Sequence, residues 1–494
     1  MQTLWERLGK QCERHRAAVQ GALVVLVTAA FVGVGSFKGP IKDLQFCASA
    51  GERWALLLLL AGLYAAVMGW VVWRKRLAMP AFLFTAGVVL AALYMRVAVF
   101  DQTSGDYEFF LKPWVQAFRD HGFRAVAMDI GDYNLPYQYI LAGIAALPMH
   151  DLYLIKLVSI VFDFALALMV MALTERFLHK RWALVALSAV LLAPTAWFNS
   201  AYWAQCDALY VFFVVACLYA MLADRPILSV AMLTVAFAFK IQTIFFFPMV
   251  LFGLLHKKYK LRHALVFPVV YLLLIAPALL AGRDFVSALT IYLRQTAQYN
   301  DQLTFNAPNI YQFFPMGKAG KQHMWFPVLQ YIEGIDPEVW NQWYTKESVG
   351  RLLGALVALA GALVLALGYY LYARRRHVAL SQVWRLSLAF TLLMPLVLPK
   401  MHDRYFYLAE CFALLYALRE PKRWFVPVLV TGASFASYMP FLVRERTIDM
   451  RVAALMMAAA MGVVLWDIVR TVREARRADP ACAQVLLEET RYEV

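Results

Sequence analysis

The sequence predicts an all-α protein that crosses a membrane many times. Of its 494 residues, 62% are hydrophobic and only 16% are charged, too little charge to cover the surface of a soluble protein of this length. The apolar residues form repeated runs of about 20, the length that spans the hydrocarbon core of a bilayer. Short clusters of Lys and Arg separate these runs, as in the cytoplasmic loops of membrane proteins.

The apolar runs predict about fourteen spanning helices. Their approximate cores are residues 18–36, 54–73, 79–99, 152–174, 183–198, 208–223, 226–240, 241–255, 264–281, 351–373, 380–399, 405–418, 424–443 and 451–469. The cores 226–240 and 241–255 are the least distinct pair, because each is short and no polar turn separates them.

The basic clusters predict the orientation of these helices. With the N-terminus inside, all of the clusters fall on the cytoplasmic side; they lie at 74–76, 176–181, 256–263, 374–377, 419–423 and in the tail from Arg470. Two long loops, 101–151 and 282–350, then lie outside. The net charge of +15 is explained by this bias, and we expect the lipid bilayer as a partner and no nucleic acid.

Two polar clusters are expected at the outer ends of helices. The first contains Asp106 and Glu108, and a carboxylate there can take the proton from a sugar hydroxyl. The alternative is that Asp106 caps an interfacial helix over 107–119. The second contains Trp203, Gln205 and Asp207. An aromatic plane with hydrogen-bonding side chains suits a sugar, and the alternative is an interfacial aromatic belt with Asp207 as a helix cap.

Two further clusters carry cations that suit a phosphate. Lys240 and Gln242 lie at a predicted outer helix end, where Lys can hold a phosphate or extend to the membrane interface. Lys400, His402 and Arg404 share one short outer turn, against the positive-inside trend. A phosphate or diphosphate ligand explains them, and the alternative is a solvated loop.

Other polar residues are less diagnostic. Asp163 lies within a predicted span, where it needs a partner on a neighbouring helix. Tyr133 and Asn134 belong to a turn before a short juxtamembrane helix over 136–149 and could also line a sugar site. The six cysteines form no CxxC pair, and we expect most of them to be buried apolar residues.

Five of these motifs, taken in order, resemble the GT-C superfamily of membrane glycosyltransferases. The resemblance is closest to bacterial proteins similar to eukaryotic GPI mannosyltransferase 2, and extends to the endoplasmic-reticulum glucosyltransferases that use dolichyl-phosphate glucose. The motifs are Ser104-Gly105-Asp106-Tyr107-Glu108, Gly131-Asp132-Tyr133-Asn134-Leu135-Pro136, Trp203-Ala204-Gln205-Cys206-Asp207, Phe239-Lys240-Ile241-Gln242 and Met401-His402-Asp403-Arg404-Tyr405-Phe406. One departure is Ala204, where the resemblance leads us to expect glycine.

The resemblance implies a GT-C fold with a large outer cavity and a donor that carries one sugar on a polyprenyl monophosphate, with inversion at the anomeric centre. Asp106 matches the position of the general base, and His402 and Arg404 match the loop that faces the donor phosphate. Residues 1–78 form a helix pair extra to this shared core. We therefore expect a catalytic membrane core over 79–420, with C-terminal helices and a cytoplasmic tail over 421–494.

The sequence thus predicts an enzyme that transfers a hexose, mannose or glucose, to a glycan or lipid-linked acceptor on the outer face of a bacterial inner membrane. Asp106 is the expected base. Lys240, Lys400, His402 and Arg404 are expected at the donor phosphate, and Glu108, Tyr133, Asn134, Trp203, Gln205, Asp207 and Gln242 around the substrates. No metal or other cofactor is expected. The alternatives are an envelope polysaccharide polymerase or ligase and a transporter or flippase of lipid-linked sugars.

Overall fold

The protein is an all-α polytopic membrane protein, as predicted. The computed structural model describes residues 16–37, 40–75, 77–297, 303–313, 346–445 and 447–478, so most of the predicted outer loop 282–350 lies outside the described residues. Within the described part, nine helices are long and apolar enough to cross a membrane, or ten if one bent pair counts as a span. Three shorter apolar helices, Asp207–Leu222, Pro226–Phe239 and Ile241–Leu255, match three further predicted cores; the total of fourteen stays a prediction.

The chain divides into two compact units. Unit 1 contains residues 1–131, 137–175 and 181–212, and unit 2 contains residues 132–136, 176–180 and 213–494. The predicted N-terminal helix pair belongs to unit 1, and the predicted C-terminal helices belong to unit 2. Whether either lies outside a catalytic core stays a prediction.

Unit 1 is built from four long helices and several short ones. The long helices and the bent segment are α2 (Arg16–Phe37), α3 (Ala50–Lys75), α4 (Met79–Val97), α7 (Asp151–Phe177) and α8 (Ala183–Leu192), with α9 (Pro194–Trp197) after the bend. The shorter elements are η1 (Tyr107–Leu111), α5 (Lys112–His121), η2 (Gly122–Ala127), α6 (Leu135–Ala145), η3 (Lys180–Trp182), η4 (Phe198–Tyr202) and the start of α10 (Asp207–Leu222). Helices α5 and α6 correspond to the two predicted interfacial helices.

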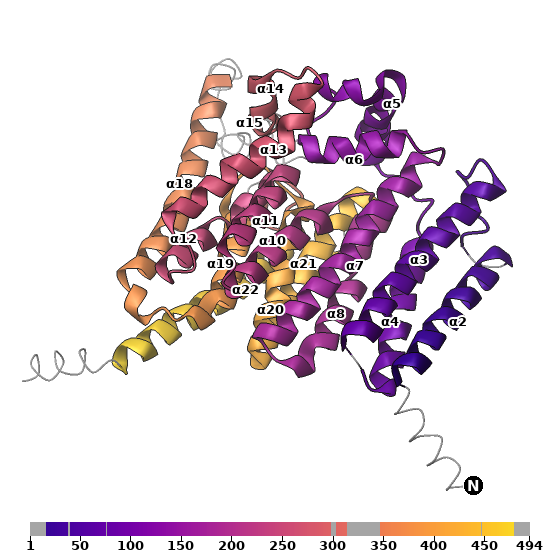
Figure 1. Cartoon of the computed structure of the whole chain (residues 1–494). Coiled ribbons are helices and arrows are strands. Elements are labelled where there is room, and N and C mark those ends of the chain that lie inside the picture. The colour runs from indigo at the N-terminus through magenta and orange to yellow at the C-terminus, as the bar shows by residue number, and fades with distance from the viewer. Residues whose placement is uncertain are drawn as a thin grey trace, which may run out of the picture. The chain divides into compact units, whose positions relative to one another are not determined.

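The N-terminal helix pair is joined to the rest of unit 1 by polar contacts. Helix α2 packs on α3, and α3 on α4 (Figure 1). The Gln20 side chain donates to the carbonyl oxygen of Leu77 at 2.7 Å. Glu52, at the start of α3, accepts from the backbone N–H of His150 at 2.5 Å, and Lys75, at its end, forms an ion pair with Glu175. Both ends of α3 are therefore fixed to the ends of α7.

Buried charges in unit 1 have partners. Asp163, within α7, accepts from Arg96 Nε at 2.8 Å and from Ser200 Oγ at 2.5 Å, which confirms the predicted partner on a neighbouring helix. Arg96 also donates to the carbonyl oxygen of Leu191 at 3.0 Å, near the 45° bend before Pro194. Proline lacks the N–H that would continue the helix, so Arg96 satisfies backbone near the break.

Lys156 is a buried cation that sequence reasoning did not single out. Its Nζ donates to the carbonyl oxygens of Val99, Phe100 and Gln102 at 3.1, 2.6 and 2.7 Å. These carbonyls follow the C-terminus of α4, where helices leave acceptors unsatisfied and where a cation is favoured. Lys156 therefore fixes the segment that leads from α4 into the Asp106 motif.

Unit 2 continues α10 and contains most of the remaining helices. These are α11 (Pro226–Phe239), η5 (Ile241–Phe246), α12 (Pro248–Leu255), η6 (Leu261–Leu265), α13 (Val266–Leu280), α14 (Phe285–Leu289), α15 (Ile291–Ala297), η7 (Ile310–Phe313), α18 (Lys346–Ala373), η8 (Arg375–His377), η9 (Leu380–Gln382), α19 (Val383–Val397), η10 (Asp403–Phe406), α20 (Tyr407–Arg419), η11 (Pro421–Arg423), α21 (Phe425–Leu442) and α22 (Met450–Arg477). Two short parallel strands, β1 (Thr304–Phe305) and β2 (Met401–His402), pair with each other.

Helices α19, α20, α21 and α22 pack together in unit 2 (Figure 1). The span Leu380–Val397, which contains α19, has 78% of its most apolar window buried, whereas the span Leu353–Ala373 within α18 has only 6%. A helix that exposes apolar side chains on nearly all sides is stable only where its surroundings are also apolar. Helix α18 is therefore a lipid-facing helix, and α19 is central.

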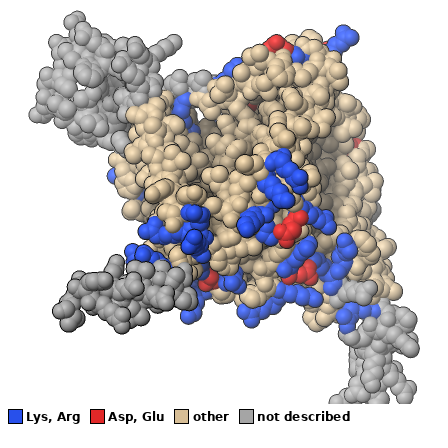
Figure 2. Space-filling view, turned by 60° about the vertical axis from the view of Figure 1, so that its left-hand side comes forward, with Lys and Arg blue, Asp and Glu red and all other residues tan. Residues whose placement is uncertain are grey.

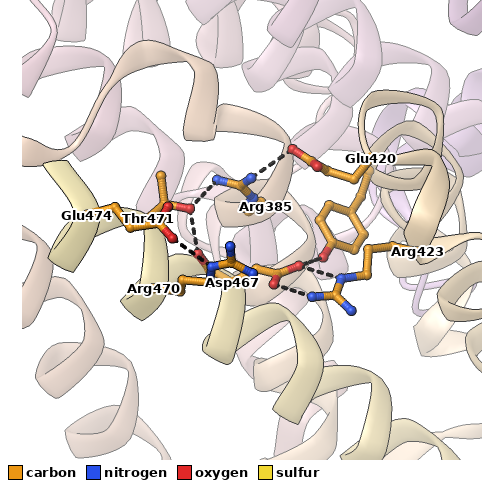
Figure 3. Close-up of polar contacts among 8 residues, drawn as sticks. Arg385, Glu420, Arg423, Asp467, Arg470, Thr471 and Glu474 are labelled. Atoms are coloured by element: carbon orange, nitrogen blue, oxygen red, sulfur yellow. Dashed lines mark hydrogen bonds and ion pairs between the residues drawn. The ribbon is translucent and has the colours of Figure 1, made fainter.

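One end of unit 2 gathers its basic clusters. Arg385 donates to Glu420 at 2.7 Å and to Thr471 at 2.8 Å, and Arg423 binds both carboxylate oxygens of Asp467 (Figure 3). Element η8 lies against α22. Figure 2 shows where Lys and Arg side chains lie on one face of the molecule. Because α19 and α20 run between this end and the turn 398–406, that turn lies at the opposite end of the unit.

Candidate functional site

The Asp106 carboxylate is held by two side chains of the Trp203–Gln205 motif. Trp203 Nε1 donates to Asp106 Oδ2 at 3.0 Å, and Gln205 Nε2 donates to the same oxygen at 2.5 Å. Asp106 makes no capping hydrogen bond to η1; instead, Ser104 Oγ accepts from the backbone N–H of Tyr107 at 3.2 Å. The alternative in which Asp106 is a helix cap is therefore wrong.

Ser104 also connects the two motifs through the backbone. Its hydroxyl donates to the carbonyl oxygen of Trp203 at 2.8 Å. Between the two donors to Asp106 lies Ala204, whose φ is +65°, in the left-handed region that favours glycine. This turn lets Trp203 and Gln205, two residues apart, reach one carboxylate oxygen. The departure from glycine at position 204 thus falls where glycine has a conformational advantage.

Asp207 and Asn199 form a reciprocal pair behind this turn. Asn199 Nδ2 donates to Asp207 Oδ2 at 2.7 Å, and the backbone N–H of Asp207 donates to Asn199 Oδ1 at 3.2 Å. Both residues are buried. The pair joins η4 to the start of α10, so the observed contacts of Asp207 are structural; its predicted substrate contact stays a prediction.

Glu108 lies apart from the hydrogen bonds around Asp106. Its carboxylate pairs with Lys112 at 3.0 Å, one helical turn away, and its side chain is 40% exposed. Among the described residues, no group of three or more His, Cys, Asp and Glu side chains could hold a metal ion. The expected independence of a metal stays a prediction.

Unit 2 contains a pocket that collects several of the other predicted residues. Its non-atom space, part of which is open to solvent, is about 270 Å³. Predicted site residues Tyr133, Lys240, Gln242 and Arg404 line it together with Asp132, Phe239, Ile241, Tyr292, Gln295 and Tyr405. The Lys240 ammonium lies 5.3 Å from the centre of the Tyr133 ring, a cation–π distance. The pocket therefore combines two cationic side chains with aromatic rings and amides.

A break between two helices places Lys240 and Gln242 in this pocket. Helix α11 ends at Phe239, Lys240 is extended at φ −146°, and the 3-10 segment η5 follows. The break explains how two short apolar helices follow each other without a polar turn. Lys240 is 4% exposed and Gln242 is 5% exposed, so the protein encloses both side chains.

The turn 400–404 separates its three predicted phosphate ligands. Only Arg404 lines the pocket. Lys400, at φ +62°, donates through Nζ to the carbonyl oxygen of Thr296 at 2.9 Å. His402 belongs to strand β2 and stacks on Phe305, with ring centroids 4.4 Å apart. The observed roles of Lys400 and His402 are to hold the turn, and a phosphate contact for either stays a prediction.

His402 is neutral at physiological pH in the structure described. Burial, followed by the positive charges of Arg404 and Lys240, lowers the pKa of its imidazole to about 3. The sequence presents His402 only as a potential cation, and its contact with a phosphate stays a prediction. A neutral imidazole still has one N–H that can donate a hydrogen bond to an oxyanion.

Asn134 supports the pocket without lining it. It is fully buried, its Nδ2 donates to Tyr271 Oη at 3.1 Å, and its Oδ1 accepts from the N–H of Leu135 at 2.8 Å. These bonds fix the start of α6 beside Tyr133. The observed role of Asn134 is structural, and its predicted substrate contact stays a prediction.

The structure therefore groups the predicted residues into two sets. Asp106, Trp203 and Gln205 form one in unit 1, whereas Tyr133, Lys240, Gln242 and Arg404 form the other in unit 2. Sequence reasoning missed Gln295, which lies on α15 in the second predicted outer loop and belongs to no recognisable motif. No protein-family model matches the chain, and a search of curated proteins also found no match.

Proposed function

We propose that this protein is a membrane glycosyltransferase of the GT-C type. It transfers a single hexose, mannose or glucose, from a polyprenyl-phosphate donor to a glycan or lipid-linked acceptor. The reaction takes place on the non-cytoplasmic face of a bacterial inner membrane and inverts the anomeric centre. The observation that carries the proposal is the Asp106 carboxylate, oriented by Trp203 and Gln205 instead of serving as a helix cap.

The proposed role of Asp106 is to accept the proton of the acceptor hydroxyl. Hydrogen bonds from Trp203 and Gln205 fix the position of the carboxylate, and a positioned carboxylate can act as a general base. In the reaction, the acceptor oxygen forms a bond to the anomeric carbon while the bond from that carbon to the phosphate oxygen breaks. The hydroxyl proton moves to Asp106, and the bonding electrons leave with the polyprenyl phosphate.

The proposed donor site uses Lys240 and Arg404. A phosphate forms strong charge-assisted hydrogen bonds with both side chains, and the planar guanidinium can bind two oxygens at once. Both line the same pocket in unit 2, which supports the assignment. Stabilising the negative charge that develops on the leaving phosphate lowers the barrier to transfer.

The reaction class can be tested by donor turnover. The purified full-length protein would be incubated with short-chain polyprenyl-phosphate mannose or glucose and a panel of envelope glycolipids as acceptors. We expect release of polyprenyl phosphate and a product one hexose heavier than its acceptor. Turnover only of lipid-linked oligosaccharides would replace the proposal with a polymerase or ligase, and transbilayer movement of an intact donor would replace it with a flippase.

Asp106→Asn tests the base. The asparagine oxygen can still accept from Trp203 and Gln205, so the variant should fold and bind donor. It cannot accept the proton, and turnover should fall by a factor of about 10² to 10⁴. Glu108→Gln and Asp207→Asn would be assayed beside it. If Asp106→Asn keeps near-normal turnover while one of the other two variants is inactive, the general base is the residue changed in that inactive variant. If all three variants are active, this mechanism is refuted.

Arg404 tests the donor site. Arg404→Ala removes a charge-assisted contact of about 1.5–3 kcal/mol and should weaken donor use by about ten- to more than a hundredfold, with acceptor use less affected. Arg404→Lys should restore only part of the loss, because a point charge does not reproduce the planar fork. Unchanged donor kinetics in Arg404→Ala would remove this residue from the donor site.

A further inference from the structure

Two amide oxygens of the unit 2 pocket lack partners among the described residues. Gln242 Oε1 and Gln295 Oε1 are buried and accept no hydrogen bond from the described part of the chain, and both residues line the pocket. Gln242 is itself 95% buried, since only 5% of it is exposed. A buried carbonyl without a donor is energetically costly. Two such atoms in one pocket therefore indicate a ligand or water that donates hydrogen bonds there.

The chemistry of these atoms separates them from the cations of the same pocket. An amide oxygen only accepts hydrogen bonds, so it pairs with hydroxyl or N–H groups. An ionised phosphate offers only acceptor oxygens and suits Lys240 and Arg404 instead. A ligand that satisfies the whole pocket therefore carries a phosphate next to hydroxyl groups.

We propose that Gln242 and Gln295 bind the sugar hydroxyls of a glycosyl phosphate whose phosphate lies against Lys240 and Arg404. Gln295 is then a sugar-binding residue from a part of the chain far from the other motifs. The rings of Tyr133 and Tyr292 also line the pocket, and aromatic faces suit the apolar C–H faces of a hexose. This inference rests on the proposed function for the identity of the donor, and on the pocket itself for the ligand chemistry.

The glycosyl phosphate could come from two sources, a lipid-linked donor or a free hexose 1-phosphate. The test therefore uses three probes: short-chain polyprenyl-phosphate mannose or glucose, the same polyprenyl phosphate without sugar, and the matching hexose 1-phosphate. Binding to the purified full-length protein would be measured calorimetrically, without any acceptor. Stronger binding of the lipid-linked probe than of hexose 1-phosphate assigns the site to a lipid donor, and the reverse order assigns it to the soluble sugar phosphate.

Gln295→Leu is the decisive variant, because it removes the acceptor and keeps a similar volume. We expect it to weaken binding of the glycosylated probe about three- to tenfold, the loss of one hydrogen bond, and to leave binding of sugar-free polyprenyl phosphate unchanged. Gln242→Leu should behave in the same way. Gln382→Leu is the matched control, since Gln382 is also buried with an unpartnered amide but does not line the pocket, and it should alter binding of neither probe.

The outcomes separate this inference from the proposed function. Suppose that Gln295→Leu and Gln242→Leu weaken binding of both lipid probes equally, or of neither. Either result would show that the amides bind only water or support the fold, and would overturn the inference. Wild-type protein that transfers hexose while Gln295→Leu keeps the same donor KM would refute only the inference. Sugar-selective binding without any transfer would refute only the function. If Gln295→Leu does not purify, Gln295→Asn, which shortens the reach of the amide, carries the same expectation.

Discussion

At the scale of single residues, the turn around Ala204 decides how Asp106 is held. Trp203 still has helical φ and ψ angles, −81° and −24°, and side chains two residues apart on a helix do not face each other. The left-handed φ of +65° at Ala204 reverses the chain between them, so that Trp203 and Gln205 both reach Asp106 Oδ2. An alanine in this conformation carries a cost of about 1–2 kcal/mol that glycine avoids.

Ala204→Gly should therefore raise the free energy of unfolding, by up to about 1 kcal/mol after the greater flexibility of glycine in the unfolded chain is subtracted. Ala201→Gly is the control, because Ala201 is equally buried but lies in the helical segment η4. There glycine should lower stability by about 1 kcal/mol. Thermal unfolding of both variants in detergent would measure the difference, and a decrease in both would contradict strain at position 204.

The surroundings of His402 decide the charge of a residue that the sequence presents as a potential cation. Its ring stacks on Phe305 and faces the positive charges of Arg404 and Lys240, so the folded protein disfavours the imidazolium. A phosphate bound near these cations would favour it again. The neutral imidazole therefore belongs to the protein without a bound phosphate.

This lowered pKa predicts a pH dependence of stability. The unfolded chain binds a proton at His402 near pH 6.5, whereas the folded protein resists protonation down to about pH 3. Stability that is fully present above pH 6.5 is therefore lost as the pH falls toward 3. The melting temperature of the wild type should fall more than that of His402→Gln between pH 7.5 and 5. Parallel curves for the two proteins would show that His402 does not contribute to the acid response.

At the scale of elements, the sequence predicted where helices lie better than how they end. The apolar runs located the long helices, because a span needs about 20 consecutive apolar residues whatever its neighbours in the fold. Both short interfacial helices were also expected. The boundary between the predicted cores 226–240 and 241–255 coincides with the break at Lys240, whereas the bend before Pro194 was missed, since it lies inside the predicted core 183–198. The contact near this bend, from Arg96 to the carbonyl oxygen of Leu191, joins residues far apart in the sequence.

The same distinction applies to the candidate site. Residue types suited to sugars and phosphates were identified, yet Asn134, Asp207 and Lys400 form structural hydrogen bonds. A polar residue at a helix end serves either purpose with the same composition. Gln295 could not be recognised, because its importance comes from a pocket shared with residues of other helices.

The ion-pair cluster of α20, η11 and α22 predicts an effect on stability (Figure 3). Arg423 binds Asp467 through Nη2 at 2.5 Å and Nε at 2.8 Å, and Tyr416 donates to the same carboxylate. Asp467→Asn should lower the free energy of unfolding by about 1.5–3 kcal/mol, because Arg423 loses a charged, partly buried partner.

Glu474→Gln supplies the matched control for this cluster. Its ion pair with Arg470 lies on the same helix, with side chains 58% and 61% exposed, against 9% and 27% for Asp467 and Arg423. Exposed pairs contribute about 0–1 kcal/mol, so Glu474→Gln should change the melting temperature little. Equal shifts for the two variants would show that burial of the Asp467 pair adds no stability.

At the scale of the whole molecule, the basic clusters predict which ends of the helices face the cytoplasm. Within unit 2, the turn 398–406 lies at the end of α19 and α20 opposite to Arg385 and Arg423. The cytoplasm retains loops rich in Lys and Arg, which predicts that the basic end lies inside and the turn outside. Each unit can be tested separately, with one introduced cysteine at each end.

In a background with Cys12 and Cys482 changed to Ser, the four other cysteines are buried, so an introduced cysteine reports its own position. In unit 1, Asp120→Cys should react with a membrane-impermeant thiol reagent added to intact spheroplasts, and Arg181→Cys should react only after lysis. In unit 2, Val286→Cys should react from outside and Arg376→Cys only after lysis. All four positions are exposed, so a lack of reaction before lysis reflects the membrane and not burial in the protein. The reverse pattern in both units would invert the topology and place Asp106 and the pocket on the cytoplasmic side, where a polyprenyl-phosphate donor used from the outer face could not reach them.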